Sequence, residues 1–299
     1  MLDDLVTALV HAGAPGAAVC LGEGDTETVA AAGDAEPDSV FGIGSVTKTF
    51  VAAAALRLAA DGVLELDGSA RRWCALAPSD VTVRMLMDHS SRIPDYMRAP
   101  GVVDAFLADP ARIWPPEELV ALVDGRETSW QYSNTNSILL GLVIEAATAK
   151  TLHAALREFV LDPLGLQSTT PPPPGSFAWA AGAMESTPRE VARFLRALLG
   201  GDFVDPAELT RTVEGDGDEF DRYGAGIAVM TSILGLSQSP CGAAWGHLGL
   251  GLNMSTAALA TPDGKRRLVV CTSGALDESG WRMLADLSWP ILCHTHTAA

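Results

Sequence analysis

Gly44-Ser45-Val46-Thr47-Lys48-Thr49-Phe50 runs directly into the alanine-rich segment 51–60. This segment, closed by Asp61-Gly62, predicts a helix over residues 46–60. Residues three apart share one face of a helix, so we expect Ser45 and Lys48 to meet. Only three of the 20 lysines and arginines of the chain are lysines. An arginine stays protonated at ordinary pH whereas a lysine can lose its proton, which makes Lys48 a candidate base.

The Ser45–Lys48 pair predicts nucleophilic catalysis. A serine hydroxyl is a poor nucleophile unless a neighbouring base accepts its proton, and a buried, neutral lysine can be that base. The start of a helix also offers backbone N–H groups and a partial positive charge to a developing oxyanion. The alternative is that Lys48 is a surface residue of an ordinary helix.

Two further short motifs carry side chains suited to the same chemistry. Tyr132-Ser133-Asn134 is the only Tyr-x-Asn in a chain with three tyrosines. Gly246-His247-Leu248-Gly249 stands at the edge of an expected strand. There a cationic or hydrogen-bonding residue would line one wall of a cleft, and a glycine would let a substrate approach the backbone.

Ser-x-x-Lys, Tyr-x-Asn and His-x-Gly, in this order, resemble the serine β-lactamase and penicillin-binding-protein superfamily. The branch that the chain resembles most contains class C β-lactamases, D-alanyl-D-alanine carboxypeptidases and related esterases. Further similar stretches extend over nearly the whole chain, at residues 81–86, 89–91, 93–96, 135–141, 162–166 and 186–195.

The resemblance implies roles for five side chains. Ser45 would attack a carbonyl and form an acyl-enzyme. Lys48 and Tyr132 would share the proton, and Tyr132 would protonate the leaving group. Asn134 would hydrogen-bond to Lys48 and to a substrate amide, and His247 would support the proton relay through Tyr132. No metal or organic cofactor is implied.

The resemblance also implies the surroundings of the substrate carbonyl. The oxyanion hole would consist of the backbone N–H groups of Ser45 and of Leu250, the residue after Gly249. Relatives that bind a substrate carboxylate often carry Thr or Ser where this chain has Leu248, and a leucine removes that hydroxyl and adds bulk. Losing a dedicated hydrogen bond to a charged group weakens binding. We therefore expect esters, amides or thioesters without that carboxylate to fit better than D-Ala-D-Ala termini or β-lactams.

The element pattern predicts an α/β (α+β) fold. Strand-like stretches lie near both chain ends, and the middle is helical. This pattern predicts an antiparallel sheet built from both chain ends, flanked by helices and interrupted by an all-helical insertion, a β-lactamase/transpeptidase-like arrangement. We expect residues 1–65 and 186–299 to form the sheet domain and residues 66–185 a mostly helical one, with the active-site cleft between them. Expected strands are 16–21, 28–32, 223–230, 243–248, 255–260 and 267–272, and expected helices are 2–11, 46–60, 81–87, 116–123, 137–147, 152–160, 188–199 and 279–293.

Composition narrows the partners and the compartment. A net charge of -17 disfavours nucleic acid and anionic membranes as partners. We therefore expect a small-molecule or peptide substrate, and the charge does not indicate the oligomeric state.

Five cysteines without a Cys-x-x-Cys pair look like small buried residues of a reducing compartment, not a disulfide framework or zinc site. His294 and His296, in the C-terminal tail, are not expected to bind a metal. With no basic, apolar leader after Met1 and no apolar run of 18 residues, we expect a cytoplasmic protein.

Three functions stay open at this level. The first is an intracellular serine hydrolase or acyltransferase that works through an acyl-Ser45 intermediate on a small metabolite or peptide. The second is a D-alanyl-D-alanine carboxypeptidase or β-lactamase. The third is a non-catalytic ligand-binding relative that keeps the fold and its cleft. Chemical activation of Ser45 distinguishes the first two from the third, because a binding protein has no need of a lysine with a lowered pKa.

Overall fold

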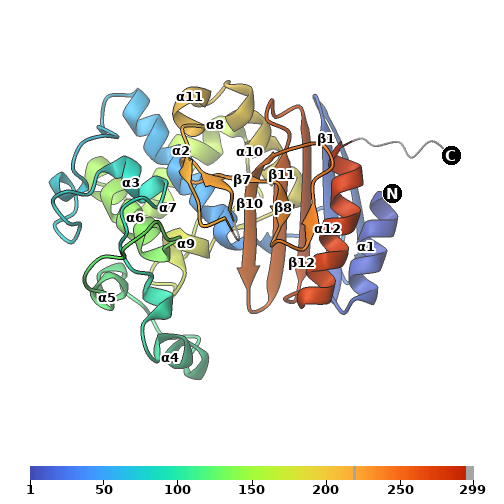
Figure 1. Cartoon of the computed structure of the whole chain (residues 1–299), viewed down its shortest axis with the longest axis horizontal. Helices are drawn as coiled ribbons and strands as arrows, with labels where there is room; N and C mark the ends of the chain where they lie inside the picture. Colours follow the sequence, from blue (N-terminus) through green and yellow to red (C-terminus); the bar gives the residue numbers. More distant parts are fainter. Residues whose placement is uncertain (218–219, 294–299) are drawn as a thin grey trace.

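A computed structural model describes residues 1–217 and 220–293 of the chain. Its main sheet has eight antiparallel strands in the order β2-β1-β12-β11-β10-β7-β6-β5, so the first two strands pair with the last ones (Figure 1). Gly16 lies opposite Ser273 in the β1–β12 pair. These strands are β1 (Gly16–Glu23), β2 (Thr26–Gly33), β5 (Val213–Glu214), β6 (Arg222–Tyr223), β7 (Ala228–Met230), β10 (Ala244–Gly251), β11 (Met254–Ala260) and β12 (Arg266–Ser273). The prediction of an antiparallel sheet from both chain ends is confirmed.

Helices cover both faces of this sheet. On one face lie α1 (Leu2–His11) and α12 (Glu278–Cys293), side by side in Figure 1. On the other face lies α10 (Pro188–Gly200), with α2 (Thr47–Ala60) in the same hydrophobic cluster. Seven consecutive residues of β1 are buried because both of its faces are covered, so its sequence reads as continuously apolar and not as alternating.

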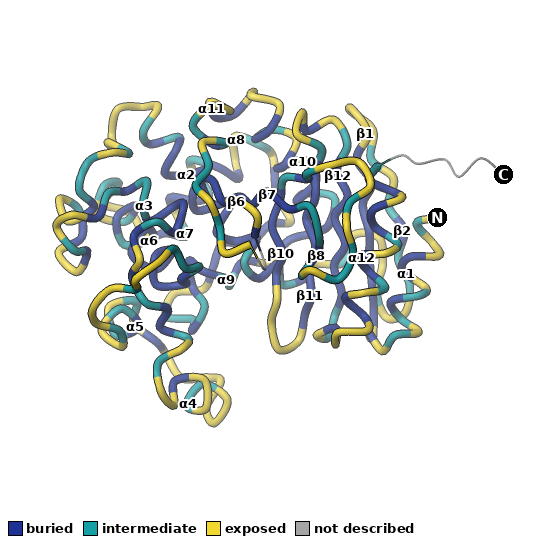
Figure 2. The backbone as a smooth tube through the Cα atoms, viewed as in Figure 1, coloured by how far each residue is buried: buried dark blue, intermediate teal, exposed yellow. Residues whose placement is uncertain are grey.

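The middle of the chain forms a helical region around α2 and α6. Nearly every residue of α2 from Thr47 to Leu58 is buried, so this helix lies inside the molecule with no solvent-facing stripe (Figure 2). The helices of this region are α3 (Val83–Met87), α4 (Val102–Ala108), α5 (Pro116–Ala121), α6 (Asn134–Thr148), α7 (Leu152–Leu156), α8 (Asp162–Leu164) and α9 (Trp179–Gly182), with a π-helical turn at Arg157–Leu161 and 3-10 turns η2 (Ala70–Arg72) and η3 (Tyr96–Arg98). Shorter elements elsewhere are α11 (Pro206–Leu209) and the strand pairs β3 (Phe41–Gly42) with β4 (Glu185–Ser186) and β8 (Ser232–Ile233) with β9 (Ser237–Gln238).

Several element boundaries differ from the sequence prediction for identifiable local reasons. The helix expected at 46–60 is preceded by a 3-10 turn, η1 (Gly44–Val46), so Ser45 stands just before α2. The helix expected from residue 81 begins at Val83, because the Thr82 hydroxyl accepts a hydrogen bond from the Met85 N–H and caps it. The strand expected at 223–230 is split into β6 and β7 around Gly226, whose φ of 67° does not fit a strand.

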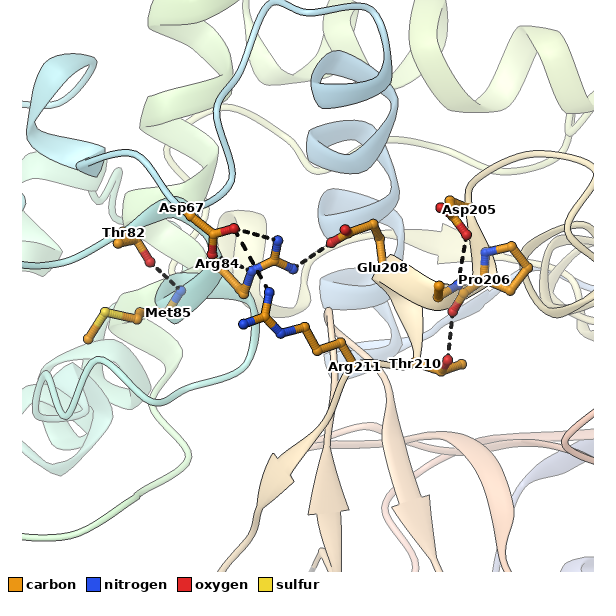
Figure 3. Close-up of polar contacts among 10 residues, drawn as sticks. Asp67, Thr82, Arg84, Met85, Asp205, Pro206, Glu208, Thr210 and Arg211 are labelled. Atoms are coloured by element: carbon orange, nitrogen blue, oxygen red, sulfur yellow. Dashed lines mark hydrogen bonds and ion pairs between the residues drawn. The ribbon is translucent and has the colours of Figure 1, made fainter.

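Arg84 connects the helical region to the part of the chain that follows it (Figure 3). Its guanidinium donates to both carboxylate oxygens of Asp67, at 2.7 and 3.1 Å, and to Glu208 of α11 at 2.7 Å. The Arg84 side chain is only 11% exposed. A half-buried bidentate pair of this kind resists separation better than a single surface ion pair.

The division into a sheet domain and a mostly helical domain, with bounds at residues 66 and 186, stays a prediction.

The expectation that none of the five cysteines forms a disulfide is wrong for two of them. Cys241 and Cys293 are joined, and the other three, Cys20, Cys74 and Cys271, are free and buried. The partners are 52 residues apart in sequence, yet their Cα atoms are 5.6 Å apart. Strands β10 to β12 and helix α12, which lie between the two cysteines in sequence, bring Cys293 back beside Cys241. The spacing of the cysteines in the sequence does not reveal this contact.

Two expectations concern metals and membranes. In residues 1–217 and 220–293, no group of three His, Cys, Asp or Glu side chains could hold a metal ion; His294 and His296 lie outside the described residues. No single helix in that part of the chain is long and apolar enough to cross a membrane. Only the pair Asn134–Thr148 and Leu152–Leu164, bent by 80°, meets the length and hydropathy criteria together.

Candidate active site

Ser45 and Lys48 meet as their spacing predicts. Lys48 Nζ lies 2.9 Å from Ser45 Oγ, and the lysine side chain extends from the buried first turn of α2. Two more oxygens surround the same nitrogen: Oδ1 of Asn134 at 2.8 Å and the carbonyl oxygen of Ala181 at 2.6 Å. Lys48 is 3% exposed, so these three oxygens stand in for water around the amine.

Burial changes the proton affinity of Lys48. Desolvation lowers the pKa of its ammonium to about 7, against an opposing effect of the nearby Asp95 carboxylate. A large share of Lys48 is therefore neutral at physiological pH. A neutral amine has two N–H bonds and one lone pair. The Asn134 and Ala181 oxygens can only accept, so they hold the two N–H bonds and leave the lone pair facing the Ser45 hydroxyl.

Asn134 is held from its other side. Its Nδ2 donates to Oδ2 of Asp95 at 2.9 Å and to Sδ of Met97 at 3.4 Å. The contact with Lys48 expected from the resemblance is present. A substrate amide that also bonds to Nδ2 would have to displace one of these two partners, so that part of the role stays a prediction.

Tyr132 lies beside the amine of Lys48. The centre of its ring is 4.9 Å from Nζ, and the ring packs against the buried imidazole of His89, with ring centres 4.4 Å apart. Both Tyr132 and Asn134 come from the turn that opens α6. The aromatic ring of Tyr132 thus lies beside the Lys48 amine, and its role as proton donor to a leaving group stays a prediction.

His247 is near Tyr132, but both of its ring nitrogens are engaged elsewhere. Nδ1 lies 2.6 Å from the carbonyl oxygen of Leu248, and Nε2 lies 2.7 Å from the hydroxyl of Tyr223. Burial, with a smaller effect of Lys48, lowers the pKa of His247 to about 3, so the ring is neutral. A neutral ring carries one N–H, which must donate to the carbonyl, so Nε2 accepts from Tyr223. The ring centres of His247 and Tyr132 are 6.0 Å apart; a part for His247 in the proton relay stays a prediction.

Gly249 is needed for backbone contact within the protein. A Cβ at Gly249 would collide with the carbonyl oxygen of Ile43, and a Cβ at Gly44 would lie 2.9 Å from the Gly249 Cα. Strand β10 therefore lies directly against the residues that precede Ser45. The oxyanion hole expected from the backbone N–H groups of Ser45 and Leu250 stays a prediction.

Leu248 is not open to a ligand. It is 2% exposed, pairs with Ala257 across β10 and β11, and belongs to the hydrophobic cluster that also includes Leu259. Its expected role as bulk in the substrate site is therefore wrong, because its side chain fills the core. A leucine at this position has no hydroxyl group.

Sequence reasoning missed four contributors to this site: Asp95, Ala181, His89 as the packing partner of Tyr132, and Tyr223. Asp95 was within a stretch that carries the family resemblance, which was the only available signal. Ala181 acts through its carbonyl oxygen, so its residue type carries no signal at all. Each lies more than 20 residues from its partner, and only the packing of the elements brings them together.

A protein-family model described as Beta-lactamase matches residues 2–288. Among curated proteins, the chain is 29% identical over 143 residues to penicillin-binding protein 4* of Bacillus subtilis (strain 168), covering 44% of this chain and 30% of that protein. It is 34% identical over 149 residues to esterase EstB of Burkholderia gladioli, covering 44% of this chain and 38% of the esterase. The matches thus span about a third of the length of these curated relatives.

Solved structures match over nearly the whole chain. A D-stereospecific amidohydrolase from a Streptomyces species is 29% identical, with a TM-score of 0.81 over 94% of this chain and 96% of that one. The D-amino acid amidase of Ochrobactrum anthropi SV3 is 25% identical, with a TM-score of 0.79 over 95% and 96% of the two chains.

Proposed function

The chain belongs to the Beta-lactamase family, and from this membership we propose that it is a serine hydrolase that forms an acyl-enzyme on Ser45. The observation that carries the proposal is the position of Lys48 Nζ, 2.9 Å from Ser45 Oγ, in a buried setting that lowers the lysine pKa to about 7. A non-catalytic ligand-binding relative has no use for such a base. Keeping a lysine buried costs stability, so its presence favours catalysis.

The reaction follows from the positions of these groups. The Ser45 hydroxyl gives its proton to Lys48 Nζ as its oxygen bonds to the substrate carbonyl carbon. Negative charge develops on the carbonyl oxygen, where the backbone N–H groups of Ser45 and Leu250 would stabilise it. As the tetrahedral intermediate collapses, the leaving group takes the proton of Tyr132, which regains one from Lys48. Water then attacks the acyl-serine ester by the same steps in reverse and releases the acid.

For the substrate we propose an amide or ester of a small D-configured amino acid or peptide. The support is the likeness over nearly the full length to a D-stereospecific amidohydrolase and a D-amino acid amidase. A neutral His247, with both ring nitrogens engaged within the protein, brings no positive charge to a substrate carboxylate. Carboxylate-terminated peptides are therefore less favoured than amides.

A D-alanyl-D-alanine carboxypeptidase or β-lactamase activity is the second candidate. It is favoured by the relatedness to penicillin-binding protein 4*. A cytoplasmic location stays a prediction, and the Cys241–Cys293 disulfide weighs against it, because disulfides persist mainly in oxidising compartments.

The first test is intact-protein mass after brief exposure to a fluorophosphonate, on the wild type and on Ser45→Ala. We expect one adduct on the wild type and none on the variant. Next, D- and L-phenylalanine amide, p-nitrophenyl acetate and penicillin G are compared as substrates. Faster release of ammonia from the D-amide supports the amidase proposal, and turnover of penicillin alone favours the second candidate. A folded wild type without an adduct would overturn the hydrolase proposal.

A further inference from the structure

We propose that Asp95 is a positioning residue for the catalytic base: it fixes the Asn134 amide so that Lys48 aims its lone pair at Ser45. This inference rests on the proposed function. It concerns a residue that acts through Asn134, and it explains how one proton acceptor is directed at one hydroxyl.

Asp95 is itself rigidly held. It is 7% exposed; its Oδ1 accepts from the Met97 N–H at 3.1 Å, capping η3, while its Oδ2 accepts from Asn134 Nδ2 at 2.9 Å. The flanking residues are tied to the start of α6. The Thr135 hydroxyl donates to the Pro94 carbonyl at 2.7 Å and accepts from the Tyr96 N–H at 2.9 Å. The carboxylate therefore approaches Asn134 from a fixed direction.

A carboxylate on this side permits only one orientation of the amide. The two orientations of an asparagine side chain have nearly the same shape and differ in where the oxygen and the NH₂ lie. Turned over, Asn134 would direct its oxygen at the Asp95 carboxylate, two acceptors face to face, and its NH₂ at the Lys48 amine. An ionised carboxylate cannot donate, so only the observed orientation satisfies both neighbours.

The observed orientation also decides where the lysine lone pair points. Asn134 Oδ1 and the Ala181 carbonyl oxygen take the two N–H bonds of the neutral amine, and Ser45 is the third neighbour. If Asn134 turned over, its NH₂ would compete with Ser45 for the lone pair. Misdirecting a reactive group in this way slows the reaction even when every catalytic residue is present.

Charge gives Asp95 a second, measurable effect. Its carboxylate raises the pKa of Lys48 against the larger lowering by burial. The other titratable groups around the amine are His89, His247 and Tyr132. Burial lowers the pKa of both histidines, to about 3 for His247, so they stay neutral where Lys48 titrates. Removing the Asp95 charge should therefore move the Lys48 midpoint to lower pH.

The test is the second-order rate constant for labelling of Ser45 by a fluorophosphonate, measured from pH 5 to pH 9. In this reaction the serine oxygen bonds to phosphorus, fluoride leaves, and the serine proton goes to Lys48. In the wild type we expect the rate to rise to a plateau with a midpoint near pH 7. For Asp95→Asn we expect the midpoint to fall by about one pH unit. For Asp95→Ala we expect the same fall and a plateau lower on the order of tenfold.

The matched control is Asp205→Asn. Asp205 caps α11 by accepting from the Ala207 N–H at 2.9 Å, as Asp95 caps η3, but it has no part in the Ser45 site. We expect its midpoint and plateau to match the wild type, which separates the loss of a cap from the loss of a positioning residue. If Asp95→Ala does not fold, the test uses Asp95→Asn, whose side chain has nearly the same shape. The quantity compared with the wild type is then the pH midpoint of its labelling rate.

The two proposals fail in different ways. A folded wild type that takes no label overturns the proposed function itself. A wild type that labels at Ser45, with folded Asp95 variants that keep both its midpoint and its plateau, overturns the role of Asp95 and leaves the hydrolase proposal intact.

Discussion

Lys48 Nζ lies 2.8 Å from Oδ1 of Asn134, although 86 residues separate the two along the chain. The contact joins the first turn of α2 to the first turn of α6, two largely buried helices. The reactive environment of Lys48 thus depends on how these helices pack, whereas its contact with Ser45 is local.

Replacing Lys48 with arginine should remove the base and keep the positive charge. An arginine does not lose its proton at ordinary pH, so we expect kcat/KM for an activated ester to fall by about 10²–10⁴-fold, the usual contribution of a general base. Circular dichroism and a thermal melt show whether the variant is folded. A folded Lys48→Arg enzyme with wild-type kcat/KM would mean that another group takes the Ser45 proton.

The rate should depend on pH through Lys48. The lysine must be neutral to accept a proton, and its pKa in the folded protein is lowered to about 7. We therefore expect kcat/KM for p-nitrophenyl acetate to fall about tenfold for each pH unit below 7 and to level off above it. A rising limb centred near pH 10 would mean that Lys48 is solvated and is not the base.

Gly249→Ala should damage both stability and reactivity. The added methyl group would collide with the Ile43 carbonyl, and backbone cannot move aside as a flexible side chain can. We expect a loss of at least about 2 kcal/mol in unfolding free energy and slower labelling of Ser45. Gly200→Ala is the control: its Cβ would meet nothing closer than 3.7 Å, so we expect little change. Equal denaturant midpoints for both variants would show that β10 does not press against Ile43.

The buried His247 should make the protein sensitive to acid. Its pKa is about 3 in the folded protein and 6.5 in an ordinary environment, so below pH 6.5 the unfolded chain binds the proton first. Stability therefore falls as the pH drops from 6.5 toward 3, by about 2 kcal/mol at pH 5 from this group.

Urea unfolding at pH 7 and pH 5 measures this effect. In His247→Gln the loss between the two pH values should be smaller than in the wild type by about 2 kcal/mol, whereas the same change at the exposed His11 should leave the loss as it is. His89, whose pKa burial also lowers, adds to the loss in all three proteins. An identical loss in His247→Gln and wild type would contradict a buried, neutral His247.

Reducing the Cys241–Cys293 disulfide should destabilise the fold and spare the active site. The bond closes a loop between residues 52 apart, and cross-links of this kind contribute about 2–4 kcal/mol. Under denaturing conditions, iodoacetamide should modify three cysteines before reduction and all five after it. Five modified cysteines before reduction would exclude the bond.

Sequence predicts best those features that depend on interactions between residues close together along the chain. Ser45 and Lys48 meet because residues three apart share a helix face, and the alanine-rich residues 51–60 form the helix that their composition predicts. Thr82 is a residue type that favours helix caps, so the sequence contains a signal for this boundary. The helix nevertheless begins at Val83 and not at the expected residue 81, because a capping residue lies just outside the helix. The antiparallel sheet was predictable in kind from strand-like stretches at both chain ends, but its strand order was not.

The amino-acid sequence by itself determined the fold class, the reactive pair and the family, because helix spacing and ordered short motifs survive without knowledge of the packing. Only the tertiary structure decided that burial lowers the pKa of Lys48 to about 7, that Asn134 and Ala181 contact its amine, and that Leu248 faces the core. The physical reason is that desolvation and hydrogen-bond direction depend on which distant segments close around a group, and those contacts form only when α2, α6 and β10 come together.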